Sequence, residues 1–176
     1  ILFNLTLIFM AFLYKKGRTR PLVKKTVANS EVLQVGEAVR LVSDFAVTCP
    51  AGSTIFGVIE GIVGKDGEVL TTNGAGATFD PNGSYTAASD NQTVAGVCVL
   101  INADEDSIYS APASAALGTT TGSNLAGYRM DHTSGALILD EATAATTDAQ
   151  WVSWGLDPEA ATTRVLVSIF ESQMSR

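Results

Sequence analysis

The chain has 176 residues, of which 46% are hydrophobic and 16% are charged, and its formal net charge is −7. This composition is typical of a folded globular protein and argues against intrinsic disorder over most of the chain. The acidic excess argues against direct binding of nucleic acid by the main part of the chain, because contacts with phosphates need a basic surface.

Charge is divided unevenly along the chain. Residues 1–30 hold six of the eleven Lys and Arg residues and none of the eighteen Asp and Glu residues. We therefore predict an apolar leader and basic docking arm over residues 1–25 and a single β-rich body over residues 26–176. A body of this length is large enough to bury its own core.

The first fourteen residues are nearly all apolar, and basic residues follow them at once. The run is shorter than the ~20 residues of a membrane-spanning helix. A secretory signal has its positive charges before the apolar stretch, whereas here they come after it. Three interpretations stay open: a translation start at Met10, cleavage from a precursor, or a segment that anchors the chain as a strand or helix.

From residue 22 onward, short runs rich in Val, Ile and Leu alternate with Gly, Asn, Asp and Ser, which is the pattern of β-strands and turns. This pattern predicts an all-β protein with an extended basic N-terminal arm, built as a compact β-barrel or β-sandwich of about ten short strands. The predicted strands are residues 22–27, 38–42, 55–63, 68–70, 94–101, 107–109, 125–130, 136–139, 151–155 and 164–171.

The segments between these strands are predicted as turns and loops. Gly-containing turns are expected at residues 64–67 and 132–135, because Asp and Gly tolerate the positive φ of tight hairpins. Residues 71–92 are expected to form an extended surface loop. Helices are possible only at residues 111–117 and 141–150.

The residue types that carry most catalytic and metal chemistry are scarce. Cys49 and Cys98 are the only cysteines and are predicted to be buried free thiols, with a disulfide as the alternative. His132 is the sole histidine, so one chain holds no His-based triad and no two-histidine metal site. No catalytic, metal or cofactor residue is assigned, and an enzyme is not expected.

Three further patterns were weighed for function. The acidic run at residues 104–106 has carboxylates for calcium but lacks the spacing of a calcium loop, so a solvated turn is favoured. The adjacent pair Asp131 and His132 is expected at a hairpin tip, with no catalytic role. Trp151 and Trp154 would point to opposite faces of a strand, which predicts one in the core and the other at an interface.

The basic arm carries apolar and aromatic side chains between its charges, which suits a segment that lies along an acidic protein surface. A solvated or disordered tail is the alternative. The residues predicted to bind this partner are Phe12, Tyr14, Lys15, Lys16, Arg18, Arg20, Lys24 and Lys25.

The closing run, residues 164–171, predicts a strand that is apolar on both faces. Val165, Val167 and Ile169 share one face, and Leu166 and Phe170 share the other. Both faces of such a strand must be covered. The second face packs either under a loop of the same chain or against another copy, and we favour a homo-oligomer, most simply a trimer, that self-associates through Leu166 and Phe170.

Three stretches resemble the small β-rich proteins that decorate or cement the capsids of tailed bacteriophages. They are residues 27–40, a polar turn that leads into a strand; residues 55–67, a central strand and hairpin turn; and residues 155–173, a G-x-D-P turn before an Arg-led apolar run. The resemblance implies a structural role on the outer surface of the shell, bound to the major capsid protein. It transfers no catalytic residue.

The expected protein is therefore a virion component assembled in the host cytoplasm, with no membrane and no nucleic acid as direct partners. A pilin-like or other prokaryotic envelope protein, anchored by the apolar N-terminus, is the alternative. The short apolar run and the break at Pro21 count against that alternative. A carbohydrate-binding or hydrolytic β-domain ranks last, because sequence alone cannot show paired carboxylates.

Overall fold

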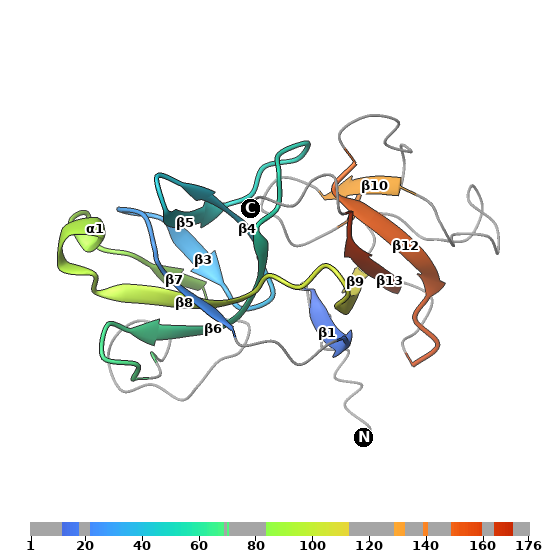
Figure 1. The fold of residues 1–176 in the computed structure, drawn as a ribbon, viewed down its shortest axis with the longest axis horizontal. Helices are drawn as coiled ribbons and strands as arrows, with labels where there is room; N and C mark the ends of the chain where they lie inside the picture. Colours follow the sequence, from blue (N-terminus) through green and yellow to red (C-terminus); the bar gives the residue numbers. More distant parts are fainter. Residues whose placement is uncertain are drawn as a thin grey trace, which may run out of the picture.

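The computed structural model describes residues 12–17, 22–68, 70, 84–112, 129–132, 139–140, 149–159 and 164–170. These residues form thirteen β-strands in three antiparallel sheets and one short helix (Figure 1). The predicted all-β fold is confirmed. The barrel alternative is not, since no sheet within the described ranges closes on itself.

The strands fall into three sheets. The six-stranded sheet contains, in spatial order, β1 (Leu13–Lys16), β9 (Ile108–Pro112), β13 (Arg164–Ile169), β12 (Trp151–Leu156), β10 (Arg129–His132) and β11 (Leu139–Asp140). The five-stranded sheet contains β2 (Val23–Thr26), β8 (Val97–Asn102), β6 (Gly57–Gly64), β4 (Ala38–Val42) and β5 (Phe45–Thr48). The third sheet pairs β3 (Val32–Gln34) with β7 (Ser84–Thr86), and helix α1 (Asn91–Val94) precedes β8.

The five-stranded sheet is buried on both faces, because neighbouring residues of its central strands enter two different cores. Ala38 and Val58 pack in a first core with Tyr109, Trp151 and Val167 of the six-stranded sheet. Figure 1 shows the two large sheets side by side, joined by the connection from β8 to β9. This first core is therefore what holds the two sheets together.

The second core lies against the opposite face of the five-stranded sheet. Val39 and Ile59 contribute to it from β4 and β6, and Leu33 contributes from β3. The pair β3–β7 covers this face, with Tyr85 packed against the core. The fold is thus a stack of sheets rather than a single two-layered sandwich.

Most long apolar runs form strands where they were predicted. The strand predicted at residues 38–42 has the bounds of β4, and six others correspond, with ends shifted by a few residues, to β2, β6, β8, β9, β12 and β13. The turn at residues 64–67 forms, with Gly67 at φ 88°. Four strands were missed, β1, β3, β5 and β7, because strands of three or four residues show no clear alternation.

Other predictions changed or cannot be followed. Within the predicted surface loop, residues 84–86 form β7 and residues 91–92 begin α1, whereas residues 71–83 lie outside the described residues. Residues 111–112 end strand β9 instead of opening a helix, since β13 pairs with them. The rest of the predicted helices, residues 113–117 and 141–148, lies outside the described part, as do residues 125–128 and 136–138 of two predicted strands.

The described part of the N-terminal arm belongs to the body, which corrects the prediction of an extended arm. Strand β1 adds to the edge of the six-stranded sheet beside β9, and β2 adds to the edge of the five-stranded sheet beside β8. The Phe12 ring is buried and stacks on Trp151 with centroids 4.2 Å apart. The Phe12 ring, which was expected to meet a partner, is therefore part of the first core.

The described residues include no helix long and apolar enough to span a membrane. The leader, residues 1–11, lies outside the described part of the chain, and so do Arg18, Arg20 and Pro21.

Replacing Phe12 with Ala tests whether this segment is structural. Because Phe12 is only 2% exposed and stacks on Trp151, we expect Phe12→Ala to lower the free energy of unfolding by about 3 kcal/mol. The control is Leu22→Ala, at a side chain that is 43% exposed, which should change stability by no more than about 0.5 kcal/mol. Denaturant unfolding measures both, and equal effects of the two variants would contradict this role for Phe12.

Candidate functional site

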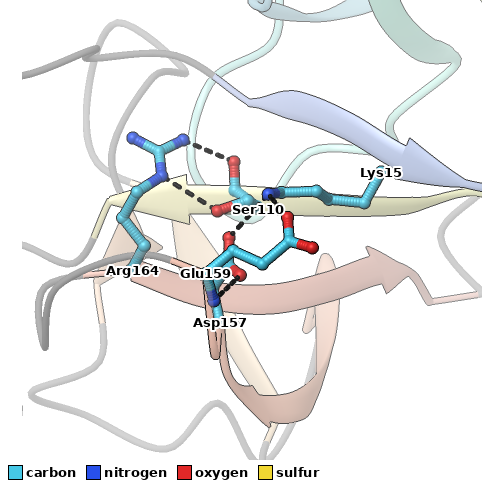
Figure 2. Close-up of polar contacts among 5 residues, drawn as sticks. All are labelled: Lys15, Ser110, Asp157, Glu159 and Arg164. Carbon is cyan, nitrogen blue, oxygen red and sulfur yellow. Dashed lines mark hydrogen bonds and ion pairs between the residues drawn. The ribbon is translucent and has the colours of Figure 1, made fainter.

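The N-terminal segment is held by a group of polar side chains at the turn between β12 and β13 (Figure 2). The Lys15 ammonium lies 3.2 Å from Asp157 Oδ2 and 2.9 Å from Glu159 Oε2. The Glu159 N–H donates to Asp157 Oδ1 at 3.0 Å, which shapes the turn. On β13, Arg164 donates from Nε to Ser110 Oγ at 2.9 Å, so the same group links β9 to β13.

The ionisation of this group favours the ion pairs. Burial alone would raise the pKa of Asp157, but hydrogen bonds from the Ser110 hydroxyl and the Glu159 N–H, with the nearby Lys15 ammonium, hold that pKa below its usual value. The hydrogen bond to Glu159, and then that to Asp157, raises the pKa of Lys15. Asp157 is therefore a buried carboxylate that needs a cation beside it, and Lys15 is that cation.

The other lysines predicted to bind a partner mostly contact the same chain. Lys24 donates to the Lys65 carbonyl at 2.7 Å, and Lys25 pairs with Asp44. Three of the four lysines that the structure describes in this segment, Lys15, Lys24 and Lys25, thus meet acceptors of the body. Lys16 is exposed.

The two aromatic residues of this segment differ. The Tyr14 side chain is 42% exposed and rests edge-on against Tyr109, with ring centroids 6.2 Å apart. Phe12 is buried, so its prediction as a partner-binding residue is corrected: the face of Trp151 offers its ring an apolar contact within the chain.

The outer face of the six-stranded sheet carries the largest exposed aromatic side chain among the described residues. Trp154 is 58% exposed, and its Nε1–H donates to Ser168 Oγ of β13 at 3.0 Å. Leu166 and Phe170 are half-buried, whereas Val165, Val167 and Ile169 are buried. We call Val152, Trp154, Leu166 and Phe170 the outer apolar face.

The two faces of β12 and β13 therefore differ as the alternation predicted. Trp151 is fully buried and Trp154 is exposed, as expected of two residues three positions apart on a strand. A β-bulge between Ser153 and Gly155 then interrupts the pairing with β13. Gly155 has φ 111°, a conformation that few side chains tolerate, and it ends the regular alternation.

His132 was predicted at an exposed hairpin tip, but the structure buries it beside Trp151 of the first core. Its neighbour in the core, Trp151, donates from Nε1 to His132 Nδ1 at 3.0 Å. An indole nitrogen only donates, so Nδ1 is the acceptor and Nε2 carries the proton. That Nε2–H lies 2.6 Å from the Cys49 carbonyl oxygen. The imidazole is thus a neutral bridge between the two large sheets, with both nitrogens engaged.

Cys49 and Cys98 are both buried free thiols, as predicted. The contact between His132 and Cys49 runs through the backbone carbonyl, so it is not the thiol–imidazole pair of a nucleophilic site. Within the described ranges, no group of three or more His, Cys, Asp and Glu residues is placed to hold a metal ion.

The acidic turn at residues 104–106 is only partly solvated, which corrects the prediction. Asp104 is buried and accepts hydrogen bonds from the Asp106 N–H at 3.3 Å and the Ser107 hydroxyl at 3.4 Å, whereas Asp106 is exposed. Asp104 therefore shapes the connection between β8 and β9.

The sequence predicted Leu166 and Phe170 on the second face of their strand but did not predict the acceptors of the lysines. Asp157 and Glu159 were noticed only as parts of a turn. The signal that pointed to them is the charge asymmetry itself, because a basic segment next to an acidic body also satisfies its charges within the chain.

Comparison of the chain with protein-family models, with curated proteins and with solved structures finds no match. The function is therefore inferred from the geometry and from the resemblance described above.

Two buried titratable groups give the fold opposite pH dependences. Burial raises the pKa of Glu37 to about 7, although Thr48 and the Gln34 N–H donate hydrogen bonds to it. Burial lowers the pKa of His132 to about 4. Glu37 therefore contributes stability that is lost as the pH rises from its unfolded value near 4.5 to about 7. His132 contributes stability that is lost as the pH falls from 6.5 to about 4.

Replacing one of these groups should remove its contribution to the pH dependence of the free energy of unfolding. In Glu37→Gln, the free energy of unfolding relative to wild type should increase by about 3 kcal/mol between pH ~5 and ~8, because the penalty for ionising a buried carboxyl is gone. His132→Gln should give the opposite trend between pH ~4 and ~7. Chemical unfolding over this pH range measures both, and equal pH profiles for the two variants would refute the assignment.

Proposed function

We propose that this chain is a structural virion protein that decorates and stabilises the outer surface of a bacteriophage capsid as a homo-oligomer, with a trimer favoured. The observation that carries the proposal is the outer apolar face. A Trp that is 58% exposed next to half-buried Leu166 and Phe170 is typical of a surface that another protein covers.

Self-association is the use that best fits this face. Trp154 lies on β12 and Phe170 directly follows the neighbouring strand β13, so copies that meet on this face would bury both aromatic rings. Aromatic anchors surrounded by smaller side chains are common at the centres of stable interfaces.

A structural role also fits the chemistry of the interior. The sole histidine is buried with both ring nitrogens engaged, and both cysteines are buried. Side chains that often act as bases or nucleophiles are used here to hold two sheets together. Such use favours a role in which the fold itself is the functional unit.

We assign the contact with the major capsid protein to the exposed side chains of the N-terminal segment. Tyr14 and Lys16 are exposed on β1, and Arg18 and Arg20 follow them in the sequence. A protein that bridges several capsid subunits in this way stabilises the shell, because release must break several contacts together.

Substitutions on the outer apolar face test self-association. Trp154→Ser should yield a folded monomer, because the exposed ring contributes little to the core but much to an interface. Phe170→Asp should do the same more strongly, by placing a charge in the interface. Light scattering after size exclusion measures mass, and circular dichroism reports folding. The control is Val32→Ser, at a side chain 50% exposed on β3, which should leave the oligomer intact. A wild-type monomer would refute self-association.

Capsid docking is tested by co-expression with the major capsid protein encoded in the same genome, followed by sedimentation of the particles. We expect the wild-type chain to sediment with the shells. Lys16→Glu and Tyr14→Ser should reduce the bound amount several-fold, and added salt should weaken binding only in part, because apolar contacts are not screened. Lys65→Glu, at an exposed lysine of another strand turn, is the charge-matched control. Absence of the wild-type chain from intact shells would refute the proposed function.

A further inference from the structure

A polar pocket of about 380 Å³ lies between β4 and the loop that follows β5. Its volume is in the range of sites for small ligands. The residues that line it are Arg40, Leu41, Gly52, Ser53 and Thr54. Arg40, Ser53 and Thr54 therefore border one pocket, and the side chains of all three can donate hydrogen bonds.

Arg40 is a half-buried cation whose Nε–H is shielded from solvent without a hydrogen-bond partner. Among the described side chains, no carboxylate forms an ion pair with it. Arg164, which is also half-buried, is in contrast satisfied by the hydroxyl and carbonyl oxygens of Ser110. A buried donor without an acceptor costs free energy that a ligand can recover. Arg40 thus lacks the acceptor that its environment calls for.

The loop that forms the other wall is fixed from inside the protein. The Gln150 amide donates to the carbonyl oxygens of Pro50 at 2.9 Å and Ser53 at 2.6 Å. The Cys49 thiol lies 3.6 Å from the carbonyl oxygens of Ser53 and Thr54. Carbonyl oxygens repel anions. In this loop they are engaged by donors on the side of the core.

The backbone of the loop is also set in advance. The Ser53 N–H donates to the Pro50 carbonyl at 3.2 Å, and Gly52 takes φ 70°, so residues 50–53 form a tight turn. A wall that is already ordered loses little entropy when a ligand binds.

We propose that this pocket binds an oxyanion, the carboxylate or phosphate group of a ligand, through the Arg40 guanidinium with help from the Ser53 and Thr54 hydroxyls. A guanidinium offers paired N–H groups that match the two oxygens of such a group, and a rotation of the Arg40 side chain toward the pocket would bring its shielded Nε–H to them. The anion is either free in solution or the acidic side chain of a partner protein. This inference does not depend on the proposed role in capsids.

The Arg40 Nε–H resonance in a proton–nitrogen NMR spectrum gives a direct test. We expect sodium acetate and inorganic phosphate to shift this resonance in a saturable way, while sodium chloride at equal ionic strength does not. Arg40→Gln should weaken binding at least tenfold, measured by calorimetry, and Ser53→Ala should weaken it several-fold. Lys65→Gln removes the same charge from an exposed site and should bind as the wild type does.

A second arm separates the two sources of the anion. N-acetylglutamate α-amide carries its carboxylate as a protein side chain does. Tighter binding of this probe than of acetate assigns the pocket to a partner's acidic residue, and equal or weaker binding assigns it to a free anion. A shift that chloride reproduces, or equal affinities of wild type and Arg40→Gln, would overturn the proposal.

Discussion

The two large sheets are joined at the buried indole of Trp151. Burying this indole requires a hydrogen-bond acceptor for its N–H. His132 accepts that hydrogen bond only as a neutral imidazole, and its own proton then faces the Cys49 carbonyl at the end of β5. Phe12 stacks on the same indole, and Tyr109 meets its edge with ring centroids 6.3 Å apart. One side chain thus gathers strands from both sheets, together with the residue that precedes β1.

Electrostatics explains why the N-terminal segment lies on the body. A basic segment joined to an acidic body can meet its countercharges within the chain at a far higher effective concentration than in a partner. Lys15 also relieves the burial of Asp157, which a surface ion pair would not do. The charge pattern that suggested intermolecular docking therefore also reflects contacts within the chain, made by Lys15 and Lys25. Of the described groups, Tyr14 and Lys16 stay exposed for a partner.

The sequence predicted the fold class, the longer strands and the two-faced character of β12 and β13, because alternation over five or more residues has a physical basis in side-chain direction. Strands β1 and β5 were not predicted, because a run of four residues fits many patterns. Whether such a run forms a strand depends on the strands that pair with it. Alternation predicted that Trp151 and Trp154 point to opposite faces, and the structure shows that Trp151 is the buried one. Alternation could not reveal that Arg40 lacks an acceptor, because only three-dimensional packing decides which polar groups meet.

The N-terminal segment supplies an outer strand to each of the two large sheets, and this arrangement fixes the order in which the chain can fold. Strand β1 pairs with Ile108–Pro112, and β2 pairs with Val97–Asn102, so the first strands made by the ribosome must wait for much later residues. Contacts of such long sequence separation slow folding. Strands β1 and β2 therefore lack their partners until residues 97–112 have been made, and during that part of synthesis their unpaired backbone groups are open to other molecules.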